Sequence, residues 1–271
     1  MTLQEYLVRI DYSGPLEPSK EVLFALHRAH LNAISYENLD IHLGRPVTLD
    51  LKQIFDKIVK RHRGGWCFEM NGLFAWALSE IGFEVTMLAA TVARAWRTDT
   101  REGDHLILLV ALDQTYLADV GFGTGFLEPI PLAAGNYKQG MLEIGLRKEA
   151  SRWLFENDPM VGPGYDFTIS PVAYSDFAEQ CQWLQSAPES GFVSKIVCHR
   201  VFPKRILSLR GAVLKDVQQS GAEHTIIKGA DHFVSLVQDE FDLAVPEIAE
   251  IWPTVWQGHV EWLKENPDAL S

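Results

Sequence analysis

The chain has 271 residues, of which 47 % are hydrophobic and 22 % are charged. This ordinary globular balance argues against a disordered chain, and the length suits one large domain or roughly two to three small ones. The formal net charge is −12, from 24 Lys plus Arg against 36 Asp plus Glu. An acidic chain has no general electrostatic reason to hold nucleic acid or anionic lipid, so a phosphate-bearing ligand would need a local basic patch.

The three cysteines, Cys67, Cys181 and Cys198, are odd in number and far apart, which argues against a disulfide framework. The chain contains no Cys-x-x-Cys pair, and we predict no metal site. The N-terminus lacks a basic region followed by an apolar run, and no apolar stretch reaches the ~18 residues that span a bilayer. We therefore expect a cytoplasmic protein without membrane contacts, in which a free thiol can act as a nucleophile.

The first third of the chain predicts three helices. The first covers residues 20–33, after Ser19 as its N-cap, and the second covers residues 51–61, after Asp50. The third begins just after Gly64 and Gly65, is apolar on more than one face, and ends at Gly82.

The pattern then changes to runs rich in Val, Ile, Leu, Thr and Tyr, which predict strands. These runs cover residues 83–93, 105–112, 115–120, 141–147, 153–156, 195–202, 205–208 and 212–217. Further helices are predicted at residues 176–184, 232–240 and 247–264. The order of helices, then strands, then a mixed segment indicates an α+β protein, with boundaries near Gly82 and Gly191.

The segment from Arg63 to Gly72, Arg-Gly-Gly-Trp-Cys-Phe-Glu-Met-Asn-Gly, carries the strongest local signal. Its two adjacent glycines allow a close backbone approach, and Cys67 then falls in the first turn of the predicted helix. Unpaired N–H groups and the helix dipole favour an anion there, and helix N-termini are among the sites that lower a cysteine pKa. We therefore predict that Cys67 is a nucleophile, whereas Cys181 and Cys198 have no glycine turn beside them and are structural.

A nucleophilic cysteine needs a base, and the base needs a group that holds it. His105 opens an apolar strand, and Asp119 ends the next one, where a buried carboxylate is costly unless it is paired. If the connecting loop has odd length and centres on Leu112, His105 lies directly opposite Asp119 with Cβ atoms about 5 Å apart, whereas an even-length loop shifts this register. We predict that Cys67, His105 and Asp119 form a catalytic triad.

These residues resemble the arylamine N-acetyltransferases. The resemblance is carried by Arg63-Gly64-Gly65-x-Cys67-x-Glu69-x-Asn71, by His105 before its apolar strand, and by Asp119-Val120-Gly121-Phe122-Gly123. Two further stretches resemble motifs of the family, namely Glu37-Asn38-Leu39-Asp40-Ile41-His42 and Ser186-Ala187-Pro188-Glu189-Ser190-Gly191-Phe192. Two others depart from it near the acceptor site of the family: Ser35-Tyr36, where a Pro-Phe pair is common, and Thr124-Gly125-Phe126.

The resemblance implies a cysteine-protease-like core and three domains. These are a helical domain of residues 1–82 that carries the nucleophile, a β-barrel-like domain of residues 83–190 that carries His105 and Asp119, and an α/β lid of residues 191–271. It also implies acetyl transfer from acetyl-coenzyme A, as co-substrate, to an arylamine, arylhydrazine or N-hydroxyarylamine. The reaction would be ping-pong, through an acetyl-Cys67 intermediate.

The same resemblance suggests which residues contact the two substrates. Trp66, Phe122 and Phe126 are candidates for the walls of a flat acceptor slot. Gly121 and Gly123 are candidates to bring backbone N–H groups close to the pantetheine or pyrophosphate of the donor, and Arg101 and Gly103 complete the predicted cofactor contacts. Other candidates to neutralise the phosphates are Arg94, Arg97, Lys195, His199, Arg200, Lys204 and Arg205. Arg63 is expected to pair with a buried acid, with Glu37 as the candidate.

Two alternatives use the same triad. One is a hydrolase or transglutaminase-like enzyme with water or lysine as acceptor, and the other is a macrolactam-forming amide synthase. A catalytically silent ligand-binding protein is an alternative of a different class, which the intact Cys, His and Asp set disfavours. The physiological acceptor and the oligomeric state stay open at this point.

Overall fold

The computed structural model describes residues 1–96 and 101–266, and it combines helices with sheets, as the sequence predicts. The α-helices are α1 (Leu3–Arg9), α2 (Lys20–Ala33), α3 (Leu39–His42), α4 (Leu51–Phe55), α5 (Cys67–Ile81), α6 (Ala178–Ser186), α7 (Gly191–Ser194), α8 (Ala230–Phe241) and α9 (Trp252–Glu265). A π-helical turn covers Asp56–Lys60, and 3-10 turns cover Arg94–Trp96, Tyr174–Phe177 and Pro246–Ile251.

The strands form two antiparallel sheets. An eight-stranded sheet has the order β5-β4-β3-β2-β9-β8-β7-β6, with β2 (Glu84–Val92), β3 (His105–Ala111), β4 (Thr115–Ala118), β5 (Ile130–Pro131), β6 (Gly135–Gln139), β7 (Leu142–Glu149), β8 (Arg152–Glu156) and β9 (Tyr165–Pro171). Its two edges approach each other, since the edge strands β5 and β6 are consecutive in the chain and only residues 132–134 join them. The sheet is therefore barrel-like.

A five-stranded sheet has the order β1-β10-β11-β12-β13. Its strands are β1 (Tyr36–Glu37), β10 (Val197–Phe202), β11 (Arg205–Arg210), β12 (Val213–Gln218) and β13 (Gly221–Ile226). Because β1 comes from the N-terminal third, this sheet ties the last part of the chain to the segment that precedes the predicted nucleophile.

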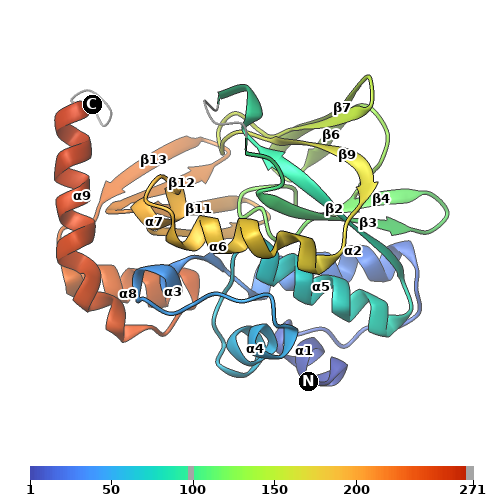
Figure 1. Ribbon diagram of the computed structural model, residues 1–271, viewed down its shortest axis with the longest axis horizontal. Helices are drawn as coiled ribbons and strands as arrows, with labels where there is room; N and C mark the ends of the chain where they lie inside the picture. Colours follow the sequence, from blue (N-terminus) through green and yellow to red (C-terminus); the bar gives the residue numbers. More distant parts are fainter. Residues whose placement is uncertain (97–100, 267–271) are drawn as a thin grey trace.

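The buried apolar side chains gather in three clusters. One lies among the N-terminal helices and β2–β4, one lies within the barrel-like sheet, and one lies between the five-stranded sheet and α8. Figure 1 shows α1, α2, α4 and α5 below the barrel-like sheet, with the five-stranded sheet, α8 and α9 at the opposite end of the molecule. On this basis we propose that residues 1–82, 83–190 and 191–271 form three domains, with β1 contributed to the third.

Some predicted elements differ from the observed ones. The helix predicted at 247–264 begins as a 3-10 turn and becomes α-helical only at Trp252, because Pro253 has no N–H with which to continue a helix from the preceding turn. Strand β13 was not predicted, since it is a polar and largely exposed edge strand without apolar alternation. Within the described ranges, none of the helices combines the length and apolar character that a bilayer-spanning helix needs.

The hairpin of β3 and β4 has a different register from the one considered above. Ala111 pairs with Thr115, so the three-residue loop centres on Asp113 rather than on Leu112. Asp119 is therefore not directly opposite His105. A shift of two residues keeps both side chains on one face of the sheet, where diagonal neighbours still reach each other.

Candidate active site

Cys67 is the first residue of α5, as the sequence predicts. The two glycines before it run closely alongside β1. A Cβ atom on Gly64 would lie 2.1 Å from the carbonyl oxygen of Ser35, and the Gly65 carbonyl accepts the N–H of Glu37 at 3.0 Å. Glycine at position 64 is therefore required for an approach that sets the nucleophile segment against the five-stranded sheet.

A buried cluster of five charged side chains holds the start of α5. Arg63 donates to Glu37 at 2.9 Å and to Asp40 at 3.0 Å, which confirms the pairing with Glu37 predicted above. Lys57 donates to both carboxylate oxygens of Glu69 at 3.0 and 2.9 Å and lies 3.0 Å from Asp40. Glu69 also accepts the N–H of the residue before the cysteine at 3.2 Å. Removing one member would leave buried charge unpaired, which is strongly destabilising.

The Cys67 thiol is 3 % exposed, and it donates to the carbonyl oxygen of Asp104 across 3.8 Å. Burial raises the pKa of this thiol well above its ordinary value, and the charges of Asp104 and Asp119 raise it further. The direction is opposite to the lowered pKa expected for a helix start, because burial and the two nearby carboxylates disfavour the thiolate. A thiolate forms here when its proton passes to a neighbouring base.

His105 and Asp119 form a buried pair, with His105 Nε2 lying 2.7 Å from Asp119 Oδ2. Burial alone would raise the pKa of Asp119, but the nearby His105 and three hydrogen bonds lower it below its ordinary value. The carboxylate therefore stays ionised and accepts the Nε2–H of the imidazole, a tautomer inferred from the acceptor. Nδ1 is then left to take a proton from another group.

Asn71 is the first residue of the site that the sequence argument did not assign. It is fully buried, and its Nδ2 donates to Asp119 Oδ1 at 2.8 Å and to the Leu106 carbonyl at 2.6 Å. Its Oδ1 accepts the N–H of Val120 at 2.9 Å. Asn71 follows Cys67 by four residues, about one helical turn, so both face the same side of α5. This spacing was the signal available in the sequence.

His27 of α2 is the second unassigned residue. It is fully buried, its Nδ1 lies 3.0 Å from the Leu127 carbonyl, and its Nε2 lies 3.3 Å from the backbone N of Asp119. This requires a neutral ring with Nδ1–H as donor and Nε2 as acceptor. The sequence holds no short-range signal for this contact, because 92 residues separate the two partners.

Gly121 and Gly123, the glycines predicted to contact the cofactor, follow the end of β4 and pack closely against neighbouring residues. Gly121 N–H donates to Asp119 Oδ1 at 2.9 Å, so the protein itself already uses this donor. A Cβ atom on Gly121 would lie 2.8 Å from Cys67 Cα. Gly123 has φ +82° and faces the ring of His199, 2.6 Å from where its Cβ would stand. Both glycines are thus required for close packing, and their contact with a coenzyme stays a prediction.

The three predicted acceptor-site aromatics occupy different environments. Phe122 is half-buried, and its ring centroid lies 5.2 Å from that of His105. Trp66 is 1 % exposed and packs edge-on against Phe192, while Phe126 is 1 % exposed and stacks on His27. Of the three rings, that of Phe122 is therefore the one that contacts His105. The acceptor contacts of all three residues stay predictions.

Arg101 and Gly103 line a cavity of about 410 Å³ beside α6. Its other lining residues include three carboxylates, those of Glu102, Asp176 and Glu179. The Arg101 guanidinium lies over the ring of Trp183 at 4.3 Å. The surplus of negative charge in this cavity does not favour phosphate groups.

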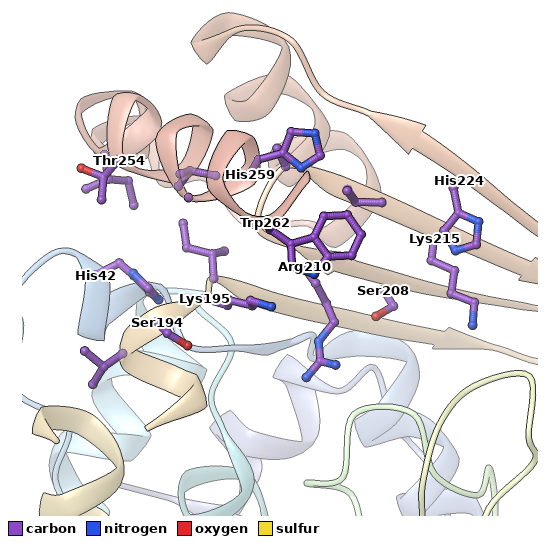
Figure 2. Close-up of a pocket in the computed structure, with 18 residues that line it drawn as sticks. His42, Ser194, Lys195, Ser208, Arg210, Lys215, His224, Thr254, His259 and Trp262 are labelled. Carbon is purple, nitrogen blue, oxygen red and sulfur yellow. The ribbon is translucent and has the colours of Figure 1, made fainter. Parts of the chain in front are cut away.

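The other basic candidates for the phosphate contacts differ in whether an acidic side chain already neutralises them. Arg94 donates to Asp166 and Glu102, and Arg205 donates to Asp216 and Glu240, so acids already neutralise both. Arg200 donates to a backbone carbonyl of α8, that of Glu240. Lys195 lines a second cavity, of about 490 Å³, between the five-stranded sheet and α9 (Figure 2). Arg97 lies outside the described residues.

One departure from the family pattern has a structural explanation. The Ser35 hydroxyl donates to the carbonyl of Phe241 at the end of α8 at 2.6 Å, a bond that proline at this position could not make. The neighbouring Tyr36 packs against His199 with ring centroids 5.5 Å apart. Ser35 thus fixes α8 to the segment before the nucleophile.

Cys67 starts a helix, its thiol contacts the carbonyl of Asp104, and the next residue, His105, is held by a buried carboxylate. A thiol, a base and a group that orients the base are the parts of a cysteine nucleophile. Within the part of the chain that the structure describes, no group of three or more His, Cys, Asp or Glu side chains is placed to hold a metal ion. The thiol, imidazole and carboxylate are groups suited to acyl transfer through sulfur, which is proposed below.

Comparisons with known proteins identify the family to which this fold and site belong. A family model described as N-acetyltransferase matches residues 20–250. The chain is 34 % identical over 246 residues to a pineal gland isozyme of arylamine N-acetyltransferase from Gallus gallus, covering 80 % of this chain and 84 % of that protein. It is 30 % identical over 279 residues to arylamine N-acetyltransferase 1 from Homo sapiens, covering 93 % and 94 %.

Solved structures give the same result. The Nocardia farcinica arylamine N-acetyltransferase superimposes with a TM-score of 0.86 at 30 % identity, covering 93 % of each chain. The Mycobacterium marinum arylamine N-acetyltransferase in complex with coenzyme A superimposes with a TM-score of 0.84 at 29 % identity, covering 91 % of this chain and 94 % of that one. The chain belongs to the arylamine N-acetyltransferase family.

Proposed function

We propose that the protein transfers an acetyl group from acetyl-coenzyme A to arylamine, arylhydrazine or N-hydroxyarylamine acceptors. Family membership and the coenzyme A complex of the M. marinum relative support this activity. The observation that carries the assignment of residues is the His105–Asp119 pair at 2.7 Å, which directly follows in the chain the Asp104 carbonyl that the buried Cys67 thiol contacts. Cys67 is the nucleophile, His105 the base and Asp119 the group that orients the base.

In the first half-reaction the Cys67 sulfur attacks the thioester carbonyl of the donor. The thiol proton passes to Nδ1 of His105, and the coenzyme thiolate leaves and takes that proton back. One thioester replaces another, so the step is close to isoenergetic. Asp119 stabilises the imidazolium that exists in between, which offsets the cost of ionising a thiol whose pKa burial has raised.

In the second half-reaction the amine nitrogen attacks the carbonyl carbon of acetyl-Cys67. His105 accepts the proton that the nitrogen loses, and the Cys67 sulfur leaves and recovers it, which regenerates the resting thiol. The donor and the acceptor use one site in turn, so the kinetics are ping-pong. Phe122, half-buried against the His105 ring, is the wall on which the aromatic part of the acceptor would pack.

The direct test is to mix the protein with acetyl-coenzyme A and locate the acetyl group by peptide mass spectrometry. It is expected on Cys67 in the parent and in Cys181→Ala, and absent in Cys67→Ala. Cys67→Ser should also lose transfer while keeping its fold. Transfer above a few per cent in Cys67→Ser, or a label on another cysteine, would reject the assignment.

The alternatives make different predictions in the same assay. A hydrolase would release free coenzyme A at an amine-independent rate, and an amide synthase would require an acyl donor other than acetyl-coenzyme A. We propose a cytoplasmic location on the basis that all three cysteines are free and buried, which suits a reducing compartment.

A further inference from the structure

We propose that Lys57 is a positioning residue for the nucleophile. Its ammonium group holds the Glu69 carboxylate, and that carboxylate in turn holds the backbone of Trp66, the residue directly before Cys67. The inference rests on the proposed function and deepens it, because it adds to the residues of the reaction a lysine that acts only through other residues.

The first observation is the turn that carries the lysine. Lys57 belongs to the π-helical turn Asp56–Lys60, which follows α4 directly. The bond that closes this turn runs from the Arg61 N–H to the Asp56 carbonyl, five residues earlier, at 2.9 Å. Turns of this kind are rare within helices and frequently lie at functional sites. Three successive residues of the turn are buried, beginning with Lys57, so the lysine lies in the interior of the protein.

The second observation is that neighbouring elements hold this turn. The Lys57 carbonyl accepts the N–H of Arg63 at 3.1 Å, and the Ile58 carbonyl accepts Nε–H of Arg9, from α1, at 2.9 Å. Arg9 also donates to the carbonyl of Ala33 at the end of α2 at 2.8 Å. The backbone that carries the lysine is therefore fixed to two other helices. A long side chain can hold another group in place only when its own support is fixed in this way.

The third observation is that the ammonium group contacts all three carboxylates of the charged cluster. It donates to both oxygens of Glu69 at 3.0 and 2.9 Å, and it lies 3.0 Å from Asp40 and 3.8 Å from Glu37. Burial alone would lower the pKa of Lys57, but Glu37, Glu69 and Asp40 raise it above its ordinary value. The lysine is therefore a cation, and its contact with both oxygens fixes the orientation of the Glu69 carboxylate.

The Glu69 carboxylate passes this constraint on to the nucleophile. Its Oε2 accepts the N–H of Trp66 at 3.2 Å, and a Cβ atom on Gly65 would stand 3.1 Å from the same oxygen. Trp66 occupies the N-cap of α5, and its side chain makes no capping hydrogen bond. Glu69 therefore supplies the side-chain acceptor at this helix start, and it lies against the last residues before Cys67.

The reaction is sensitive to the position of this helix start. In the proposed mechanism the Cys67 sulfur must reach the thioester carbonyl while its proton passes to His105. A displacement on the order of 1 Å can cost ~100-fold in rate, even when it originates away from the reacting atoms. Asn71, about one turn further along α5, holds Asp119. Lys57 and Asn71 thus fix opposite members of the triad, and loss of Lys57 should act on the rate of thioester attack rather than on donor binding.

The test is single-turnover acetylation of Cys67 by excess acetyl-coenzyme A, read at timed intervals by peptide mass spectrometry. In Lys57→Met the maximal rate constant is expected to fall about tenfold, while the donor concentration that gives half of this rate changes by less than about twofold. Unfolded protein lowers the amplitude of acetylation and not its rate constant, so a merely stabilising role would leave the rate constant unchanged. Lys60→Gln, an exposed lysine of the same turn, is the matched control and should behave as the parent.

A double variant covers the case in which Lys57→Met does not fold. The charged cluster carries two positive and three negative charges, and Lys57→Met/Glu69→Gln keeps its net charge of −1. This variant should unfold at a urea concentration close to that of the parent, because both partners of a buried pair are replaced together. Its new amide can still accept the N–H of Trp66, but no ammonium group fixes the rotamer. Its rate constant is therefore expected to stay about tenfold below that of the parent.

A parent-like rate constant in either variant would overturn the positioning role, and so would a loss confined to the half-saturating donor concentration. A double variant that does not fold would also overturn it, because the pair would then serve the fold itself. Failure of the proposed function is distinguishable, since the parent would then take up no acetyl group on Cys67. Lys57 would in that case be judged by alkylation of Cys67 with iodoacetamide at pH 7. Lys57→Met should react about tenfold more slowly than the parent, because its thiol no longer faces the base, and an equal rate would overturn the role.

Discussion

Replacement of His27 by glutamine is expected to remove an acid-sensitive element from the fold. His27 is fully buried, and its two nitrogens bond the Leu127 carbonyl and the Asp119 N–H. The second bond requires a neutral ring, because an imidazolium has no acceptor nitrogen. Burial, partly opposed by these hydrogen bonds and by the charge of Asp119, lowers the pKa of His27 from 6.5 to about 4.

The sign and size of the effect follow from proton linkage. Above pH 6.5 the ring is mostly neutral in both folded and unfolded chains, so its contribution is fully present. As the pH falls from 6.5 toward about 4, the unfolded chain takes up a proton that the folded chain does not, and stability is lost. A tenfold change in proton affinity is ~1.4 kcal/mol, so the loss reaches about 3 kcal/mol in full and about 2 kcal/mol between pH 7 and pH 5.

The assay is urea denaturation at pH 7 and pH 5, followed by tryptophan fluorescence, on the parent, His27→Gln and the exposed-site control His232→Gln. Other titrating groups are common to all three proteins, so the readout is the difference in the free energy of unfolding between parent and variant. The advantage of the parent over His27→Gln at pH 7 should shrink by about 2 kcal/mol at pH 5, whereas its difference from the control stays constant. An advantage that is the same at both pH values would refute the assignment of a neutral buried His27.

Three further experiments test the site: two substitutions and one comparison of acceptors. Asp119→Asn is expected to slow transfer by about four orders of magnitude, as in a serine-protease analogue; a pH profile of Cys67 alkylation that matches the parent would contradict this. Gly121→Ala should lower the free energy of unfolding by about 1–3 kcal/mol in urea denaturation, because its Cβ would lie 2.8 Å from Cys67 Cα. Gly191→Ala, where a Cβ meets nothing within 4 Å, is its control and should be near neutral. Aniline and hydrazide acceptors should outpace lysine or spermidine at least about tenfold in acetyl-coenzyme A consumption, ~1.4 kcal/mol in the barrier, and faster turnover with the aliphatic amines would point to a transglutaminase-like enzyme.

The pairing of His105 with Asp119 and the position of Cys67 at a helix start were predictable because each of these residues has a local signal. Gly64 and Gly65 mark a close approach before a helix, and His105 and Asp119 are polar residues at the ends of apolar strands. The hairpin register considered with its centre on Leu112 is centred on Asp113 in the structure. The difference leaves the pairing intact, because side chains alternate with a period of two along a strand.

Other parts of the site were not predictable because their partners are distant in the chain. His27 reaches Asp119 across 92 residues, and Arg63 reaches Asp40 across 23. The resting state of the thiol also depends on burial, which no local pattern reports.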